Sequence, residues 1–175
     1  SDRHSIIRPE KFGIDLVIHP ENVVCEEITQ LVRHPYASHY MEFEGGRLHM
    51  MGLRVNGNSK LTGKSVKEFC ENCDGFRVGI VAVSRKKETT IPWGDFVFEE
   101  KDTIFFIFES NSLHLLLELL DIPAISSNRV MILGGSKIGR SLAESLQGEM
   151  SVRLVEIDRE KAEKIANKLG HTMVI

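Results

Sequence analysis

Cysteine is scarce in this sequence of 175 residues, which contains three. An odd number of cysteines cannot all pair within the chain, and no basic and then apolar segment of the secretory type stands at its start. This usage favours the reducing cytoplasm over an exported, disulfide-stabilised protein. The first residue is Ser1 rather than Met, so we expect a tag remnant or a piece of a longer protein.

Long apolar runs and an excess of basic residues are also lacking. The longest apolar stretches, around residues 104–108 and 113–120, fall short of the ~18 residues that a membrane-spanning helix needs. Lysine and arginine number 22 against 25 aspartates and glutamates, so the net charge of −3 leaves no basic surplus for phosphate backbones. We therefore expect neither a membrane span nor a nucleic-acid partner.

The remaining composition is that of an ordinary globular protein. Hydrophobic residues make up 42% and charged residues 27%, which disfavours disorder, collagen-like repeats and coiled coils. At ~150 residues per domain, the length predicts one domain or two small ones. The pattern along the chain is uneven, however, and it changes twice.

The first segment, residues 12–34, has the pattern of a strand followed by a helix. An apolar run at residues 14–18 predicts the strand, and Pro20 suits the first turn of the helix because its missing N–H would be unpaired there. His34 and Pro35 predict the end of the helix. With no partner strands before it, we expect this segment to be the tail of a domain whose beginning is absent.

The middle segment, residues 40–122, alternates short strands with turns. Its apolar phase shifts at Met50 and Met51, which predicts a β-bulge. Ser65 and Glu68 have the spacing of a capping box, which predicts that a helix begins there. Strands are expected at residues 47–56, 78–83 and 102–108.

Apolar faces in this segment predict two further buried groups. Residues 113–120 form a helix that is apolar almost all round, which requires burial by its own core or by another subunit. Cys70 and Cys73 fall on the apolar face of the preceding helix, and no second cysteine pair or neighbouring histidine completes a zinc site. We expect both thiols to be buried as small hydrophobic groups rather than to form a redox or metal site.

The last segment follows a linker at residues 126–128 and alternates strands with helices. The apolar pattern predicts strands at residues 130–133, 152–157 and 173–175, with helices between them. This order is typical of a parallel sheet with crossover helices. The sequence stops before the second half that such a domain requires, so we expect a truncated lobe.

A glycine-rich segment, Gly-Gly-Ser-Lys-Ile-Gly at residues 134–139, lies between the first of these strands and its helix, and Glu156 follows ~20 positions later. In this context it predicts dinucleotide binding: glycines allow the tight turn, helix amides bind pyrophosphate and the acid binds ribose hydroxyls. Ser136 replaces one glycine and either weakens binding or donates its hydroxyl to phosphate. The alternative is a tight turn without a ligand, but Glu156 favours binding, and NAD or ATP over NADP.

Other candidate sites are weaker. A near match to a phosphate-binding P-loop ends at Lys64 and Ser65, but Asn58 stands where that loop needs glycine. Isolated acids such as Asp102 fit turn positions. The seven histidines form no metal-ligand pattern, and no nucleophile lies beside a base. We expect no metal site and no catalytic residue.

The order of these segments resembles the TrkA family of RCK-domain proteins, the regulators of potassium conductance. In that family a Rossmann-like lobe ends as residues 12–21 do, and the next lobe begins as residues 129–139 and 155–158 do. The small domain between them has the pattern L-x-G-K-S/T, a strand ending in Arg, P-x-G and G-D, which is similar to residues 61–65, 78–85, 92–94 and 101–102. Lys101 replaces the last glycine.

The resemblance implies a fold that is α/β with α+β and has three parts. Residues 1–35 would be the tail of a first Rossmann-like (TrkA-N) lobe, and residues 36–125 a small RCK C-terminal-type (TrkA-C) domain. Residues 126–175 would be the first half of a second Rossmann-like, NAD-binding lobe. Small domains of this type commonly dimerise as homo-oligomers, which suits the apolar helix at residues 113–120.

The resemblance also implies regulation rather than catalysis. Proteins of this family are cytoplasmic subunits that assemble at the inner face of the plasma membrane under a potassium-translocating (TrkH/TrkG-like) subunit. NAD(H) or ATP/ADP bound in the Rossmann-like lobes shifts their conformation. The nucleotide contacts implied for this chain are Gly134, Gly135, Ser136, Lys137, Ile138, Gly139 and Glu156.

Two other functions are open at this point. One is an NAD-dependent oxidoreductase fragment, whose catalytic residue would lie outside this sequence. The other is an effector sensor in the small domain, which would bind a cyclic dinucleotide at a dimer interface as some relatives do. Binding of NADH, ATP or a cyclic dinucleotide separates these functions.

Overall fold

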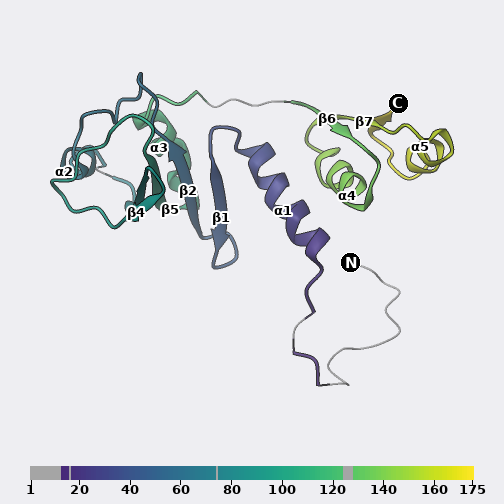
Figure 1. Ribbon diagram of the computed structural model, residues 1–175, viewed down its shortest axis with the longest axis horizontal. Helices are drawn as coiled ribbons and strands as arrows, with labels where there is room; N and C mark the ends of the chain where they lie inside the picture. The colour runs from purple at the N-terminus through teal and green to yellow at the C-terminus, as the bar shows by residue number, and fades with distance from the viewer. Residues whose placement is uncertain (1–12, 16, 74, 124–127) are drawn as a thin grey trace.

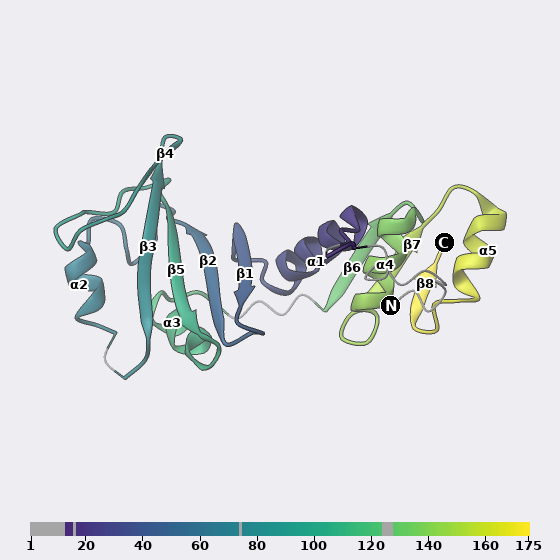
Figure 2. The same ribbon diagram turned by 90° about the horizontal axis from the view of Figure 1, so that it is seen from below.

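The computed structural model describes residues 13–15, 17–73, 75–123 and 128–175, and its strands form two sheets (Figure 1, Figure 2). One sheet is antiparallel with the order β1-β2-β5-β3-β4, and the other is parallel with the order β6-β7-β8. The helices and strands before residue 120 are α1 (Pro20–Arg33), β1 (His39–Phe43), β2 (Leu48–Arg54), α2 (Val66–Cys70), β3 (Val78–Arg85), β4 (Glu88–Thr90), β5 (Thr103–Glu109) and α3 (Leu113–Leu119). The elements after residue 128 are β6 (Arg129–Leu133), α4 (Lys137–Leu146), β7 (Ser151–Val155), α5 (Arg159–Ala166) and β8 (Thr172–Val174).

The helix expected from Pro20 is confirmed, but the strand expected before it is wrong. Pro20 lies in the first turn of α1, and His34 is its C-cap. Residues 13–15 and 17–19 form no strand, and Ile18 among them is 66% exposed. Residues 1–12 and Leu16 lie outside the described part of the chain. A strand needs a neighbour for its backbone hydrogen bonds, and an apolar run alone does not supply one.

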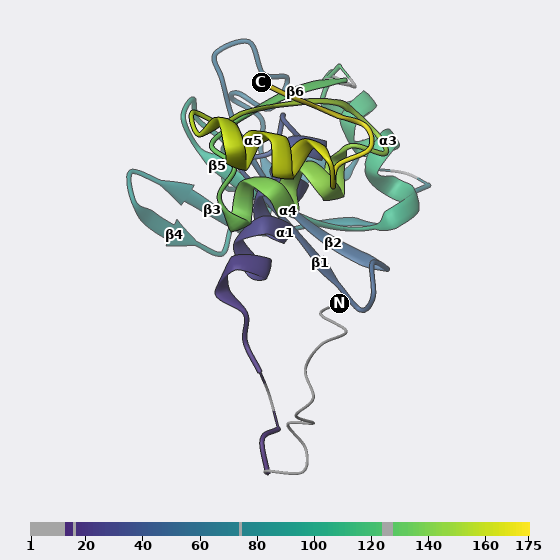
Figure 3. The same cartoon turned by 90° about the vertical axis from the view of Figure 1, so that its right-hand side faces the viewer.

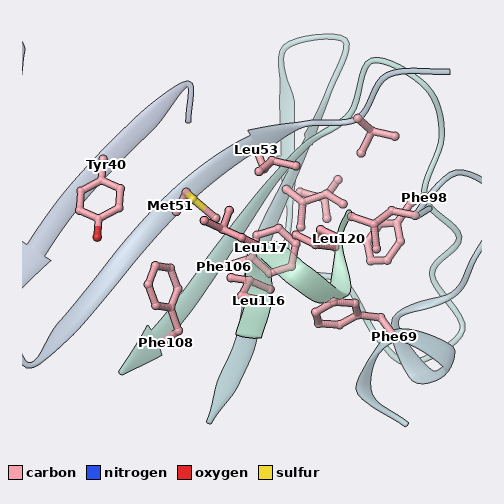
Figure 4. Close-up of a cluster of buried hydrophobic side chains, with 14 residues drawn as sticks. Tyr40, Met51, Leu53, Phe69, Phe98, Phe106, Phe108, Leu116, Leu117 and Leu120 are labelled. Atoms are coloured by element: carbon pink, nitrogen blue, oxygen red, sulfur yellow. The ribbon is translucent and has the colours of Figure 1, made fainter. Parts of the chain in front are cut away.

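One face of the antiparallel sheet carries the larger hydrophobic core (Figure 4). Alternate residues of β2 and of the central strand β5 point into it, and α2, α3 and the loop before β5 cover it. In β5, Ile104, Phe106 and Phe108 are buried while the residues between them are half-buried. This alternation confirms the strand expected there.

The apolar helix α3 is buried by this same core. Leu116, Leu117 and Leu120 are buried in it, whereas His114 and Glu118 are exposed. The helix was expected to be buried either by its own core or by another subunit, and in the structure these leucines are buried by its own core. The dimer through the small domain stays a prediction, without further support from α3.

The β-bulge expected at Met50 and Met51 is wrong. β2 pairs with both of its neighbours without a register shift, and the irregularity lies in β3, at residues 80–82. The apparent phase shift arises because His49 faces the core. Its ring nitrogens are hydrogen-bonded to the hydroxyl of Tyr40 at 3.1 Å and to a backbone carbonyl at 2.9 Å, which makes burial of this polar ring possible.

The thiols expected to be buried beside α2 lie outside the core. α2 is a single short helix, so Phe69 reaches the core while Cys70 is exposed and Cys73 is half-buried at the edge. The capping box that begins the helix is confirmed. The Ser65 hydroxyl accepts the N–H of Glu68 at 3.2 Å, and the Glu68 carboxylate accepts the N–H of Ser65 at 2.7 Å.

An ion pair between the half-buried Arg85 and the buried Asp102 holds the loop before β5 against the end of β3. Arg85 donates through Nε and Nη2 to the two carboxylate oxygens of Asp102, each at 2.8 Å, and the N–H of Glu99 donates to the same group. Burial raises the pKa of Asp102, but these hydrogen bonds outweigh it and hold that pKa below its ordinary value. Asp102 is therefore a structural anchor and not a simple turn residue.

Helices α4 and α5 lie on the same face of the parallel sheet, and this lobe faces the viewer in Figure 3. The small core between them and the sheet contains Ala143, Leu146, Val152, Leu154 and Ile165. The strands and helices expected in this segment are confirmed, with ends that differ by a few residues. The linker expected at residues 126–128 lies mostly outside the described residues.

α1 packs against both units (Figure 2). Val32 near its end contacts the core of the parallel lobe, and Tyr36, just after the helix, contacts the core of the small domain. His34 between them stacks on Tyr40 of β1, with ring centroids 3.8 Å apart. The helix is therefore a direct mechanical connection between the two sheets.

Lys101 has a backbone conformation that favours glycine, with φ at +76°. A residue with a Cβ pays ~1 kcal/mol for that conformation. We expect Lys101→Gly to raise the free energy of unfolding by about 0.5 kcal/mol or more in urea titrations. Lys64→Gly, at an exposed loop position outside the left-handed region, is the control and should lower it. The opposite order of the two variants would contradict this account.

Candidate functional site

The glycine-rich loop begins with a sharp turn directly after β6. Gly134 has φ at +98°, and its N–H donates to the carbonyl of Val155 at 2.8 Å. At Gly139, in the first turn of α4, a Cβ would overlap the carbonyl oxygen of Gly134. Both glycines are required by the backbone itself, and they allow α4 to begin after only residues 134–136 beyond the carboxyl end of β6.

Ser136 is the N-cap of α4. Its Oγ accepts the N–H of Gly139 at 3.2 Å, which satisfies one of the amides that a helix leaves unpaired at its start. That bond does not use the hydroxyl hydrogen, which can still be donated. Donation to phosphate stays a prediction, but the capping role explains why serine is suited to this position.

Glu156 directly follows β7 and faces the loop. One carboxylate oxygen accepts the N–H of Gly135 at 2.9 Å, the other accepts the N–H of Asp158 at 3.2 Å, and Lys161 forms an ion pair with the group. The side chain is only 7% exposed. The bond from the Lys161 ammonium, with those from the two N–H groups, lowers the pKa of Glu156 to about 2. The carboxylate is therefore ionised at any physiological pH.

Gly135 is a third position without room for a side chain. A Cβ there would overlap the end of Ile165 in α5 and would lie 2.9 Å from a carboxylate oxygen of Glu156. In the pattern G-x-G-x-x-G this residue occupies a variable position, so the pattern does not predict its importance. The structure adds a packing role: Gly135 lets the loop lie directly on α5 and on the acid.

The start of α4 is exposed and positively charged. Lys137 has a 58% exposed side chain, and Arg140 one turn later is also exposed. The first-turn amides and the helix dipole add to this charge and favour an anion. Of the seven residues expected to contact a nucleotide, Gly134, Ser136 and Lys137 are exposed, Ile138 and Glu156 half-buried, and Gly135 and Gly139 buried.

Two ion pairs connect α4 with α1. Lys137 at the start of α4 contacts Glu21 at 3.5 Å, and Arg33 at the end of α1 donates two hydrogen bonds to Glu149 beyond α4, at 2.7 and 3.2 Å. The two helices therefore run in the same direction. Each pair is partly exposed, so each contributes at most ~1 kcal/mol to stability. Lys137, the first residue of α4, nevertheless has a direct contact with α1.

Three residues of this site were not predicted from the sequence: Lys161, Ile165 and Glu21. A local signal exists for Lys161, because Asp158 is the N-cap of α5 and accepts the N–H of Lys161 at 3.0 Å. That cap places Lys161 in the first helical turn, beside the end of β7. Glu21 has no such signal, since it lies 116 positions from its partner.

Two further expectations concern other kinds of site. Within the described ranges, no three or more histidine, cysteine, aspartate or glutamate side chains are grouped so that they could hold a metal ion. No helix in those ranges is both long and apolar enough to cross a membrane. Ser65 of the near-match P-loop is accounted for by its capping box.

The fold and the loop define the class of protein. A small antiparallel domain and a Rossmann-like lobe together make up the RCK fold, and residues 50–121 match the model of the TrkA-C domain while residues 130–175 match that of the TrkA-N domain. The crystal structure of the GsuK RCK domain is similar with a TM-score of 0.50 and 16% identity, over 85% of this chain and 32% of that one. This likeness concerns the fold alone.

The chain belongs to the TrkA family of RCK-domain proteins. The Trk system potassium uptake protein TrkA of Halomonas elongata is 30% identical to it over 99% of this chain, and that of Vibrio alginolyticus is 26% identical over 99%. The chain spans 38% of the length of each of these relatives.

The hydrogen bonds from Gly135 and Asp158 and the ion pair with Lys161, together called the Glu156 clamp, predict that the stability of the chain depends on pH. Because its pKa is about 2 in the folded chain and near 4.5 ordinarily, its contribution is complete above pH 4.5 and is lost as the pH falls towards 2. Urea titrations should show that Glu156→Gln lowers stability at pH 7 and flattens the acid limb of the profile. Glu160→Gln, which is exposed on α5, is the control and should leave the profile unchanged. Identical profiles for all three proteins would contradict the clamp.

Proposed function

We propose that this chain is part of a nucleotide-sensing regulatory subunit of a Trk-type potassium uptake system, and that NAD(H) or ATP/ADP binds at residues 134–139 and Glu156. The observation that carries the proposal is the bond of 2.9 Å between the Glu156 carboxylate and the N–H of Gly135. It places an ionised acid and the positive start of α4 on either side of one glycine. A turn that served packing alone would need neither group.

The start of α4 suits the pyrophosphate of such a nucleotide. The backbone N–H groups of Lys137 and Ile138 lie in the first helical turn, and the Ser136 hydroxyl and the Lys137 ammonium add two donors. Gly134 and Gly139 keep the backbone free of side chains at this point. All of these donors are compatible with a diphosphate and none of them distinguishes NAD(H) from ATP.

Glu156 suits the adenosine ribose. Ribose hydroxyls would donate to its carboxylate and would share its oxygens with Gly135 and Lys161. A phosphate on the same ribose would meet an ionised carboxylate at close range, which is repulsive. The proposal therefore orders the ligands: NADH and ATP bind more tightly than NADPH.

α1 offers a way for a bound nucleotide to act at a distance. A phosphate at the start of α4 competes with Glu21 for Lys137, and α1 continues through His34 to the stacked ring of Tyr40 in the small domain. A ligand shifts conformations only by binding them unequally, and this competition is one source of unequal binding. We propose that the resulting change is passed to a potassium-translocating membrane partner.

The remaining parts of the proposal follow from the family. Potassium uptake is what the names of the relatives record. We propose the same process for this chain, with a regulatory rather than a catalytic role, in the cytoplasm, and at the membrane only through its partner. A homo-oligomer through the small domain belongs to the same proposal, as does the division at residues 35 and 125.

Calorimetric titration tests the site. NADH or ATP should bind, and Glu156→Ala should weaken that binding at least about tenfold, because a lost charge-assisted hydrogen bond costs ~1.5 kcal/mol or more. Glu160→Ala is the matched control and should bind as the parent chain does. Clear heat with a cyclic dinucleotide and none with NADH or ATP would overturn the proposal and favour a sensor in the small domain. Hydride transfer from NADH would favour the oxidoreductase.

Competition for Lys137 gives a second test. Glu21→Gln removes the acid that contacts Lys137, so we expect it to increase the affinity for NADH or ATP about two- to threefold, a change that fits the energy of an exposed pair. Glu26→Gln, also exposed on α1, should leave the affinity unchanged. Equal or weaker binding by Glu21→Gln would contradict the coupling while leaving the site itself untouched.

A further inference from the structure

Cys70 and Cys73 stand apart from the nucleotide loop, at the end of α2 in the small domain. Cys70 is the last residue of the helix and is exposed, and Cys73 is half-buried against the edge of the core. Both line the same open cavity of about 560 Å³ beside the ends of β3 and β5. The pair is therefore accessible to a small reagent from solvent, in contrast to Cys25, which is 6% exposed.

The backbone between them is a tight turn. The N–H of Cys73 donates to the carbonyl of Cys70 at 3.0 Å, which closes a four-residue turn. The ends of such a turn have Cα atoms within ~7 Å of each other. Disulfides join Cα atoms that are usually ~4.4–6.8 Å apart. The turn therefore brings the Cα atoms of the two cysteines to about the separation that a disulfide spans.

The two sulfurs differ in their surroundings. The Cys73 thiol donates to the carbonyl of Phe69 at 3.2 Å, so it points back over the last turn of α2. Cys70 is the more exposed of the two residues, and Arg77 lines the cavity that both share. An exposed thiol next to a second, partly covered one is the arrangement of an attacking and a resolving cysteine.

We propose that Cys70 and Cys73 form a reversible redox site that closes to an intramolecular disulfide. The oxidant is a hydroperoxide. The Cys70 thiolate attacks the terminal peroxide oxygen, the O–O bond breaks, and a sulfenic acid forms as hydroxide or alkoxide leaves. The Cys73 sulfur then attacks the Cys70 sulfur, its proton and the sulfenic hydroxyl leave as water, and the S–S bond forms. Two electrons pass from the sulfurs to the peroxide, and a dithiol reverses the step by exchange.

Formation of the disulfide would affect the core of the small domain. A disulfide removes the thiol hydrogen that Cys73 donates to Phe69. Phe69 is 3% exposed and packs on Phe106 of the central strand, with ring centroids 5.4 Å apart (Figure 4). Oxidation therefore changes the end of α2 next to buried aromatic rings. This site goes beyond the proposed function and does not depend on nucleotide binding.

Thiol counting by mass spectrometry tests the site. The reduced chain, unfolded and alkylated with N-ethylmaleimide, carries three adducts, one for each cysteine. After hydrogen peroxide it should carry one adduct and have lost two hydrogen atoms as a monomer, and dithiothreitol should restore three. Three adducts after peroxide, a disulfide-linked dimer, or a loss that dithiothreitol does not reverse would each overturn the proposal.

Variants assign the roles. Cys25→Ala is the matched control and should go from two adducts to none, because the redox pair is intact. Cys73→Ser should stop at a sulfenic acid that dimedone traps on Cys70, and Cys70→Ser should form neither the disulfide nor the dimedone adduct. Loss of the disulfide in Cys25→Ala would show that a different pair reacts and would overturn the assignment. Circular dichroism of each reduced variant checks that it is folded before peroxide is added.

Discussion

The close approach of Gly139 to the carbonyl oxygen of Gly134 determines the geometry of the candidate site. Since no Cβ fits between them, only residues 134–136 separate the end of β6 from the start of α4. The N-cap Ser136 and the first lysine of the helix, Lys137, therefore lie together at this point. Glu156 arrives at the same place because β7 pairs in register with β6, Leu133 opposite Val155. The site is therefore a result of glycine packing and strand register, which also explains why a buried carboxylate can reach the loop amide.

α1 connects that site with the small domain. The helix is held alongside α4 by an ion pair at each end and continues into a residue that stacks on the edge strand of the antiparallel sheet. The end contacts are weak and exposed, so they can exchange at small cost, whereas Cys25 and Thr29 of the helix stay buried. The ends of the helix can therefore exchange partners while Cys25 and Thr29 keep its middle packed.

Local patterns predicted the parallel lobe well, because its strands, its helices and its glycine loop are each encoded within a few neighbouring residues. Predictions failed where distant contacts decide. His49 is polar but is buried, because its ring is hydrogen-bonded to Tyr40 and to a turn carbonyl. A bulge was therefore expected in β2, whereas the irregularity of the sheet lies in β3. Similarly, the loop and Glu156 could be found from spacing, but Glu21 could not, since only the folded chain brings it to Lys137.

Nuclear magnetic resonance of the nitrogen-15-labelled chain, titrated with NADH, tests the central claim most directly because it detects weak binding residue by residue. If a nucleotide binds at this loop, the amide signals of residues 134–139 and of the turn at Glu156 should shift most, and Glu156→Ala should remove most of these shifts. Shifts concentrated in the small domain, with the amides of residues 134–139 unmoved at saturating NADH, would contradict it.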